Sequence, residues 1–428
     1  MYSNEKGYSF MNAKNNLFSN AALLMILSTF ASVLNYTFQI MLGNLLQVSE
    51  YGQFNLINSF ASNMLTLFTP LSMLACRLTA ERKERIKEND LVYKQLLKVI
   101  GAMGCIVFIG GIVLYSTAEN IYSLSGISMW VVILVMIVIS GFYSFTNAVI
   151  QGSQRFIFYG IMGIFVVLVK IVLSYVFICF GKGVNGVVIA MLVSFFLAFA
   201  LFCLYIKKVL YRADVSEYIQ KIGKSEIVQL YGLVFVAQLL FSFCINGGEI
   251  MFLSMFYDSE QLGLYACAGT LGKICLYVIS VVATVLFPSF ATAKMQGRDT
   301  ESLYLKILAL MFVFSVIFCI GLNVVGPYLI ELLYGDSYAQ SKEYLRYIIP
   351  FILFLGEISI THSYYLGIDR VKGYLAMLII SIVVAVSIIW FLMPTLGIAI
   401  VILGIFGNII IIMSVLDVVR RRRINECK

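Results

Sequence analysis

Charged residues are scarce in this chain. Of its 428 residues only 12% are Asp, Glu, Lys or Arg, whereas 61% are hydrophobic; a soluble protein carries about 25% charged residues. The apolar residues gather in long runs, for example 130–140 and 379–392. A helix needs roughly 20 such residues to cross a bilayer, and lipid offers no partner to an unpaired backbone group. The composition excludes a soluble domain and predicts an all-α polytopic membrane protein.

Metal-binding and catalytic motifs are also missing. The nine cysteines are scattered without a CxxC pair, and His362 is the only histidine, so we expect neither a metal nor a cofactor. The sequence has no phosphate-binding loop, no GxSxG and no HExxH, which argues against an enzyme and against ATP-driven transport. The net charge of +8 lies in short tracts between apolar runs, which indicates membrane orientation rather than nucleic-acid binding.

About twelve apolar segments are long enough to span the membrane. We predict spans at 17–46, 51–76, 92–118, 127–150, 156–180, 184–206, 227–257, 262–290, 303–325, 344–366, 371–393 and 395–419. In that arrangement 25 of the 30 Lys and Arg residues fall on the side of the two termini. Because cytoplasmic loops are enriched in Lys and Arg, we expect both termini in the cytoplasm, and the longest outer loop at about 326–343.

The chain repeats itself at an offset near 211 residues. Gly52 and Gly263 lie in similar segments that open the second and eighth spans, and Gly186 matches Gly397. The segment Gly152–Arg155 matches Gly367–Arg370 at an offset of 215 residues. We therefore predict two parallel six-helix halves, 1–206 and 227–428, joined by a cytoplasmic connector at 207–226. Such repeats around a midplane site are typical of transporters.

Four ionisable residues at membrane depth are candidate substrate ligands. They are Lys170, Lys273, Glu249 and Glu357. A charge at the centre of a spanning helix costs roughly 2.5–3.5 kcal/mol on insertion scales, so it faces a cavity or a partner. Either lysine could instead pair with Glu249 or Glu357 to hold helices together, and His362 is expected to be a hydrogen-bonded packing residue.

Uncharged polar residues recur at helical spacing beside these charges. The first span contributes Asn35 and Gln39, and the eighth contributes Tyr277 one turn after Lys273. Such stripes cannot face lipid without a cost, so they face another helix or a wet cavity. Either role fits the sequence, and we include these three residues among the candidate substrate-binding residues.

Three loop motifs give the chain a family resemblance. They are Val48–Phe54, Gln151–Arg155 and Leu332–Tyr338. With twelve spans in two halves, the chain resembles the Wzx-type polysaccharide flippases of the multidrug/oligosaccharidyl-lipid/polysaccharide (MOP) exporter superfamily. The resemblance implies a V-shaped, MATE-like pair of lobes around a cavity that opens alternately to each side. It also implies a location in the bacterial cytoplasmic (inner) membrane.

The cargo implied by the resemblance is an undecaprenyl-pyrophosphate-linked oligosaccharide, such as an O-antigen or related repeat unit of lipopolysaccharide biosynthesis. The expected partners are this lipid-linked oligosaccharide, membrane lipids and the polysaccharide polymerase machinery. Cavity lysines suit the cargo, since a pyrophosphate needs cations in a low-dielectric site. The polyprenyl tail can stay in lipid.

Three other functions are open from the sequence. Drug/cation antiporters of the same superfamily resemble each other in an acidic residue within the first span, where this chain has Asn35 and Gln39. A membrane polysaccharide polymerase or ligase would carry a large external loop, which is absent here. A lipid-packing protein would explain the repeat but not the lysines at membrane depth.

Overall fold

The computed structural model describes residues 26–81, 89–113, 115, 126–153, 155–210 and 224–426. Over these residues the chain is almost entirely helical and contains no strand. Eight described helices are long and apolar enough to cross a membrane, and a ninth span arises if one bent pair is counted as a single crossing. Each of the twelve predicted spans contains a described helix. The prediction of an all-α polytopic membrane protein is confirmed.

The described residues pack into two compact units. The first lies within Met1–Met41 and Leu67–Lys221, and the second within Leu42–Thr66 and Ile222–Lys428. Packing thus groups the segment Leu42–Thr66 with the C-terminal part of the chain. The lobes 1–206 and 227–428 stay a prediction, and much of the predicted connector, 211–223, lies outside the described residues.

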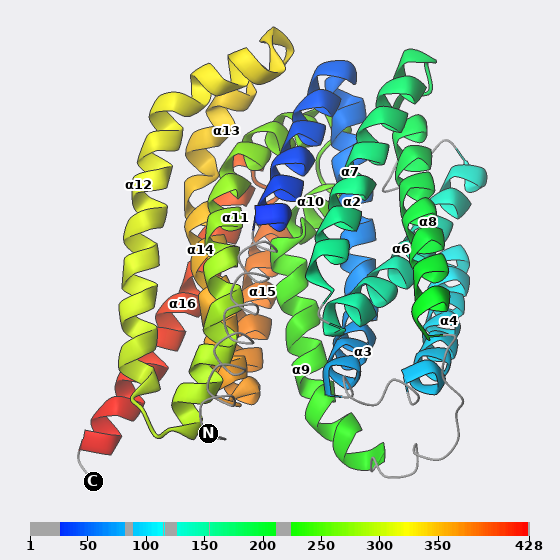
Figure 1. Cartoon of the computed structure of the whole chain (residues 1–428). Coiled ribbons are helices and arrows are strands. Elements are labelled where there is room, and N and C mark those ends of the chain that lie inside the picture. Colours follow the sequence, from blue (N-terminus) through cyan, green and yellow to red (C-terminus); the bar gives the residue numbers. More distant parts are fainter. Residues whose placement is uncertain are drawn as a thin grey trace, which may run out of the picture. The chain divides into compact units, whose positions relative to one another are not determined.

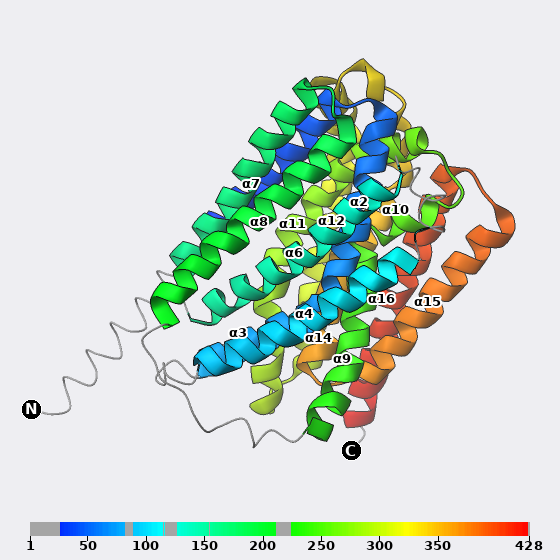
Figure 2. The same cartoon turned by 90° about the vertical axis from the view of Figure 1, so that its right-hand side faces the viewer.

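The first unit contains α3, α4, α6, α7, α8 and most of the first helix. The bounds are Thr69–Glu81 (α3), Asn89–Val113 (α4), Ile127–Gly152 (α6), Phe156–Cys179 (α7), Gly183–Leu210 (α8) and Ile26–Leu45 for the first helix. α8 packs along both α6 and α7, and Figure 2 shows α7 and α8 running side by side. A cluster including Met162, Val166 and Phe202 fills the space between them.

The second unit contains α2 and all helices from α9 onward. The bounds are Val48–Leu65 (α2), Lys224–Ile245 (α9), Gly248–Leu253 (α10), Ser259–Met295 (α11), Thr300–Tyr334 (α12), Ser341–Tyr347 (α13), Ile349–Gly367 (α14), Val371–Leu392 (α15) and Leu396–Glu426 (α16). α14 lies at the centre, against α11, α12 and α16. Figure 1 shows the end of α16 and the start of α12 at the same end of the unit.

The seventh and tenth predicted spans are broken helices. The seventh breaks at Gly247, whose φ of +83° lies in the left-handed region, where glycine carries no Cβ penalty. The adjacent glycines Gly247 and Gly248 weaken the helix at this point. The tenth span bends by 54° between α13 and α14, at Ile348 and before Pro350, which sits at the start of α14 where its missing N–H does no harm.

The segment 326–343, expected to be the longest of the outer loops, is mostly helical. α12 continues to Tyr334, with Pro327 inside the helix, and a 3₁₀ turn at Asp336–Tyr338 and α13 occupy most of the remainder. Hydropathy locates the part of a helix that lies in lipid. Gly326 and Pro327 are typical of a helix end, yet α12 continues through both residues to Tyr334.

Candidate functional site

Lys170 is a buried cation in the first unit. It lies on α7 with 8% of its surface exposed, and its Nζ donates to Asn35 Oδ1 at 2.7 Å. The same Nζ lies 4.2 Å from the centroid of the Phe38 ring. Asn35 Nδ2 donates to the Ala31 carbonyl at 3.0 Å, which turns the amide oxygen toward the lysine. An ammonium has three N–H donors, and no described carboxylate pairs with this one.

Three uncharged residues were also predicted to bind substrate: Asn35 and Gln39 of the first helix and Tyr277 of α11. Asn35 contacts Lys170, whereas Gln39 is half-buried one turn further along the same helix. Tyr277 lies on α11, one turn after Lys273, and its side chain is outside the described part of the structure.

Lys273 is held by a carboxylate in the second unit. Its Nζ lies 3.0 Å from Glu249 Oε1; the Glu249 side chain is 3% exposed and that of Lys273 is 26% exposed. Glu249 follows the break at Gly247, and α2 packs on this break: an added Cβ at Gly247 would lie 2.2 Å from Ser59 Oγ, and Asn63 Nδ2 donates to the Asn246 carbonyl at 3.2 Å. Of the two lysines that could pair with Glu249 or Glu357, Lys273 therefore forms such a pair, with Glu249.

Glu357 is a buried carboxyl near the centre of the second unit. It lies on α14 with 1% of its surface exposed, and no described residue hydrogen-bonds to either carboxyl oxygen. Ser315 of α12 packs against the neighbouring Gly356, which places a hydroxyl beside the carboxyl. Neither lysine is paired with Glu357 in the described part of the chain.

His362 is a packing residue, as predicted. It is 5% exposed, Nε2 lies 2.9 Å from Gln238 Oε1, and the ring stacks on Phe241 at a centroid distance of 3.8 Å. Within the described residues, no three His, Cys, Asp or Glu side chains gather closely enough to hold a metal ion.

A cavity of about 770 Å³ lies at the end of the second unit where α14 passes into α15. Its lining includes two cations, Arg370 and Lys372, and an apolar wall made by Leu233, Val234 and Met377. Sequence reasoning missed this cavity. The repeated segment Gly367–Arg370 could have indicated it, but we used that segment only to identify the internal repeat.

The chain matches one known protein family over most of its length. The model of a family described as "Polysaccharide biosynthesis protein" matches residues 41–343. No curated protein matches the chain.

Solved structures of similar fold include three transporters. An inward-facing multidrug resistance MATE family transporter of the MOP superfamily has a TM-score of 0.74 at 19% identity, over 91% of this chain and 94% of its own. The lipid II flippase MurJ, in an inward closed conformation, has a TM-score of 0.72 at 16% identity, over 93% and 87%. A MOP superfamily transporter from Pyrococcus furiosus, with reversed polarity of its binding pocket, has a TM-score of 0.64 at 19% identity, over 93% and 92%. The chain thus shares the fold of solved transporters of the MOP superfamily, as the resemblance implies.

Proposed function

Since the chain belongs to the polysaccharide biosynthesis protein family, we propose that it is a flippase for an undecaprenyl-pyrophosphate-linked oligosaccharide. The cargo would be an O-antigen or related repeat unit, moved from the inner to the outer leaflet of the bacterial cytoplasmic membrane. The fold supports transport, since chains of similar fold are transporters and a lipid II flippase. The multi-pass helices support a membrane location.

The observation that carries the proposal is that no described carboxylate neutralises the buried ammonium of Lys170. A lysine at membrane depth is costly, and a carboxylate would remove that cost by forming an ion pair. Among the described residues, the ammonium contacts the neutral Asn35 amide and the Phe38 ring, and no carboxylate pairs with it. Its positive charge stays uncompensated within the described residues. A diphosphate presents the anionic oxygens that such a cation binds by charge-assisted hydrogen bonds.

The Lys273–Glu249 pair has a different proposed role. Lys273 is already neutralised, yet its side chain is 26% exposed. An incoming diphosphate competes with Glu249 for the ammonium, so this site binds the cargo more weakly than Lys170. The amides of Asn35 and Gln39 and the hydroxyl of Tyr277 would hold sugar hydroxyls, while the polyprenyl tail stays in lipid.

We further propose that the two predicted lobes, 1–206 and 227–428, expose the cargo alternately to the two sides of the membrane. The termini would be cytoplasmic, and polymerase machinery would receive the flipped cargo at the outer face. The repeat of Gly52 at Gly263 and of Gly186 at Gly397 supports two halves with the same orientation.

A drug/cation antiporter is the second candidate, and Glu357 is the observation that favours it. A buried carboxyl without a hydrogen-bond partner can take up a proton or a cationic ligand. The first helix carries no carboxylate, and a cationic drug would meet Lys170 with like charge. We therefore favour the flippase.

The test is complementation of a flippase-null cell, with surface polysaccharide and membrane protein level both measured. Wild-type and Lys170→Arg proteins should restore surface glycan, and Lys170→Ala should not despite normal insertion. Full surface glycan from the Lys170→Ala/Lys273→Ala double variant would refute the diphosphate site. Drug resistance conferred by wild type, with no surface glycan in a panel of glycan-producing hosts, would support the antiporter.

A further inference from the structure

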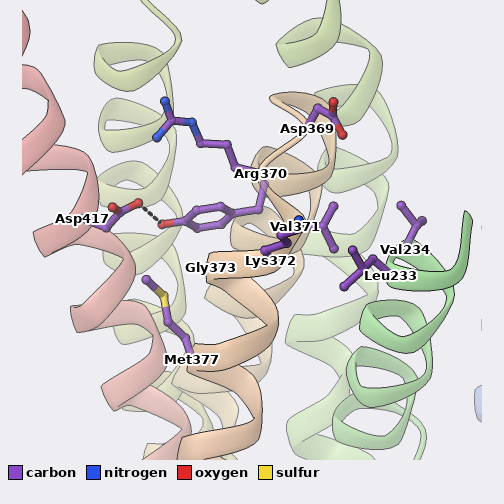
Figure 3. A pocket seen from close by; sticks show the side chains of 10 residues that line it. Leu233, Val234, Asp369, Arg370, Val371, Lys372, Gly373, Met377 and Asp417 are labelled. Carbon is purple, nitrogen blue, oxygen red and sulfur yellow. Dashed lines mark hydrogen bonds between the residues drawn. The ribbon is translucent and has the colours of Figure 1, made fainter. Parts of the chain in front are cut away.

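The cavity at the junction of α14 and α15 is amphiphilic. Val371 and Met377 from α15 and Leu233 and Val234 from α9 give it apolar walls, while the rim is formed by charged residues of the turn. Figure 3 shows Leu233 and Val234 facing the cavity from α9. The cavity lies at the first turn of the spanning helix α15. Its apolar part is therefore level with one membrane surface.

The cavity is lined by two cations, Arg370 and Lys372, and by two carboxylates, Asp369 and Asp417, of which Asp417 is paired. The side chains of Arg370 and Lys372 are exposed and make no hydrogen bond or ion pair with a described residue. Asp417, across the cavity, accepts from Tyr365 Oη at 2.9 Å and from Arg421 Nη2 at 2.6 Å. Arg370 and Lys372 outnumber the remaining carboxylate, Asp369, so the charge left over in the cavity is positive. Figure 3 shows Arg370 extending toward the side of Asp417, and Asp369 pointing the other way.

The internal repeat offers a comparison for Arg370. Its equivalent in the first unit is Arg155, at the 215-residue offset. Arg155 donates to Tyr205 Oη and lies over the Tyr205 ring at 5.3 Å from its centroid. In the second unit the last helix offers Asp417 at this end, but that carboxylate is occupied by Arg421. Arg370 therefore lacks the contact that engages Arg155, and Lys372 adds a cation where the first unit has Ile157.

We propose that this cavity binds the phosphate headgroup of an anionic phospholipid. Arg370 and Lys372 contact the phosphate oxygens, and the acyl chains lie along the walls made by α9 and α15. Basic pockets between spanning helices at the membrane surface are suited to such headgroups. This lipid is a resident ligand, distinct from the transported cargo, so the proposal does not depend on which substrate is flipped.

The experiment uses the full chain, purified in a neutral detergent, with short-chain phosphatidylglycerol as the probe. Binding is measured by native mass spectrometry and by the shift of the apparent melting temperature. The Arg370→Gln/Lys372→Gln variant should raise the dissociation constant at least about tenfold. The control is Arg420→Gln/Arg423→Gln, which removes the same charge from exposed positions of α16. It should change the constant less than about threefold.

A second variant tests the cavity without touching its charges. Gly373 lines the cavity on α15, and a Cβ added there would meet nothing within 4 Å, so Gly373→Phe should fold and occupy the space of the lipid. It should weaken phosphatidylglycerol binding as strongly as the double variant does. Wild-type binding by Gly373→Phe would overturn the proposal, as would equal loss in the control.

Two further probes identify the source of the phosphate. Inorganic phosphate at millimolar concentration should not displace phosphatidylglycerol, and phosphatidylcholine should bind at least about tenfold more weakly. Displacement by free phosphate would make the cavity a soluble-anion site, and equal binding of phosphatidylcholine would remove the role of charge. Tighter binding of farnesyl pyrophosphate than of phosphatidylglycerol would assign the cavity to the transported lipid. Each of these results would overturn the proposal.

Discussion

Gly52 of α2 and Gly263 of α11 make reciprocal close contacts across one helix crossing. A Cβ added at Gly52 would lie 1.9 Å from the carbonyl oxygen of Ser259, and one added at Gly263 would lie 2.0 Å from that of Val48. Each glycine thus packs against the carbonyl one turn before the other glycine. The two glycines are equivalent in the 211-residue repeat, so the repeated segments pack against each other about a local two-fold relation.

We predict that Gly52→Ala and Gly263→Ala each destabilise the protein. The blocking atoms belong to backbone, which cannot move aside as a flexible side chain can, so the helices must separate. Overpacking of this kind costs about 1–3 kcal/mol and at times more. The measurement is the apparent melting temperature of the purified protein, followed by size-exclusion chromatography after heating.

The control for this pair is Gly321→Ala in α12, where an added Cβ would meet nothing within 4 Å. Its melting temperature should stay equal or rise, since alanine favours helix over glycine by about 1 kcal/mol. Wild-type stability of both Gly52→Ala and Gly263→Ala would show that α2 and α11 do not approach each other this closely.

The positions of the helices were largely predictable from the sequence. Long apolar runs can only be satisfied as helices in lipid. The break in the seventh span falls at adjacent glycines, Gly247 and Gly248, which weaken a helix. The bend at Ile348 and the extension of α12 to Tyr334 were not predictable. A bend depends on what packs around it, and α12 continues through Gly326 and Pro327, which are typical of a helix end.

The sequence predicted which residues belong to the candidate site. It did not predict which of them contact each other. Lys170, Lys273 and Glu249 were identified because charge at membrane depth is costly. Hydropathy does not fix how a helix is rotated, so it could not indicate that Glu249 faces Lys273 while Lys170 faces Asn35. The cavity beside Arg370 was missed because it forms where a turn and two helix ends meet.

A second prediction concerns the Lys273–Glu249 pair. Lys273→Met should destabilise the protein, because it leaves the Glu249 carboxylate buried without its partner. Such a loss amounts to about 3–5 kcal/mol for a fully buried pair, and to less here because the Lys273 side chain is 26% exposed. The Glu249→Gln/Lys273→Met variant should recover most of the stability, measured as the apparent melting temperature.

The exposed pair Lys342–Glu331 is the control for this cycle. Its Nζ–Oε2 distance is 2.9 Å, with side chains 35% and 60% exposed. Lys342→Met should therefore leave the apparent melting temperature close to that of wild type. If Lys273→Met proves as mild as Lys342→Met, the buried pair does not hold α10 against α11.

A third prediction concerns topology. α11 runs from Ser259 to Met295 and α12 returns from Thr300 to Tyr334, so reporter fusions at Asp258 and Asp336 should both read outside. Fusions at Arg155, Asp299 and Lys428 should read cytoplasmic, following the Lys and Arg bias. A cytoplasmic signal at Asp258 or Asp336, or an outside signal at Asp299, would break the twelve-span arrangement.

The last prediction is that Asn35→Asp abolishes transport without unfolding the protein. Asn35 Oδ1 lies 2.7 Å from Lys170 Nζ, so an aspartate at this position forms an ion pair in nearly the same space. If Lys170 acts through its uncompensated charge, this replacement should lower surface glycan at least about tenfold in complemented cells, since a competing carboxylate needs to weaken binding by only about 1.4 kcal/mol. Protein level and melting temperature should stay at or above wild type.

Asn323→Asp in α12 is the matched control for that variant. Asn323 Nδ2 donates to the carbonyl four residues before it, that of Cys319, at 3.0 Å, as Asn35 Nδ2 does to Ala31. Asn323→Asp therefore introduces the same charge at a half-buried helical position in the other unit, far along the chain from Lys170, and transport should persist. Transport by Asn35→Asp at the level of this control would mean that the cargo does not need a free positive charge at Lys170. In that case Lys170 would act only as a hydrogen-bond donor that ties α7 to the first helix.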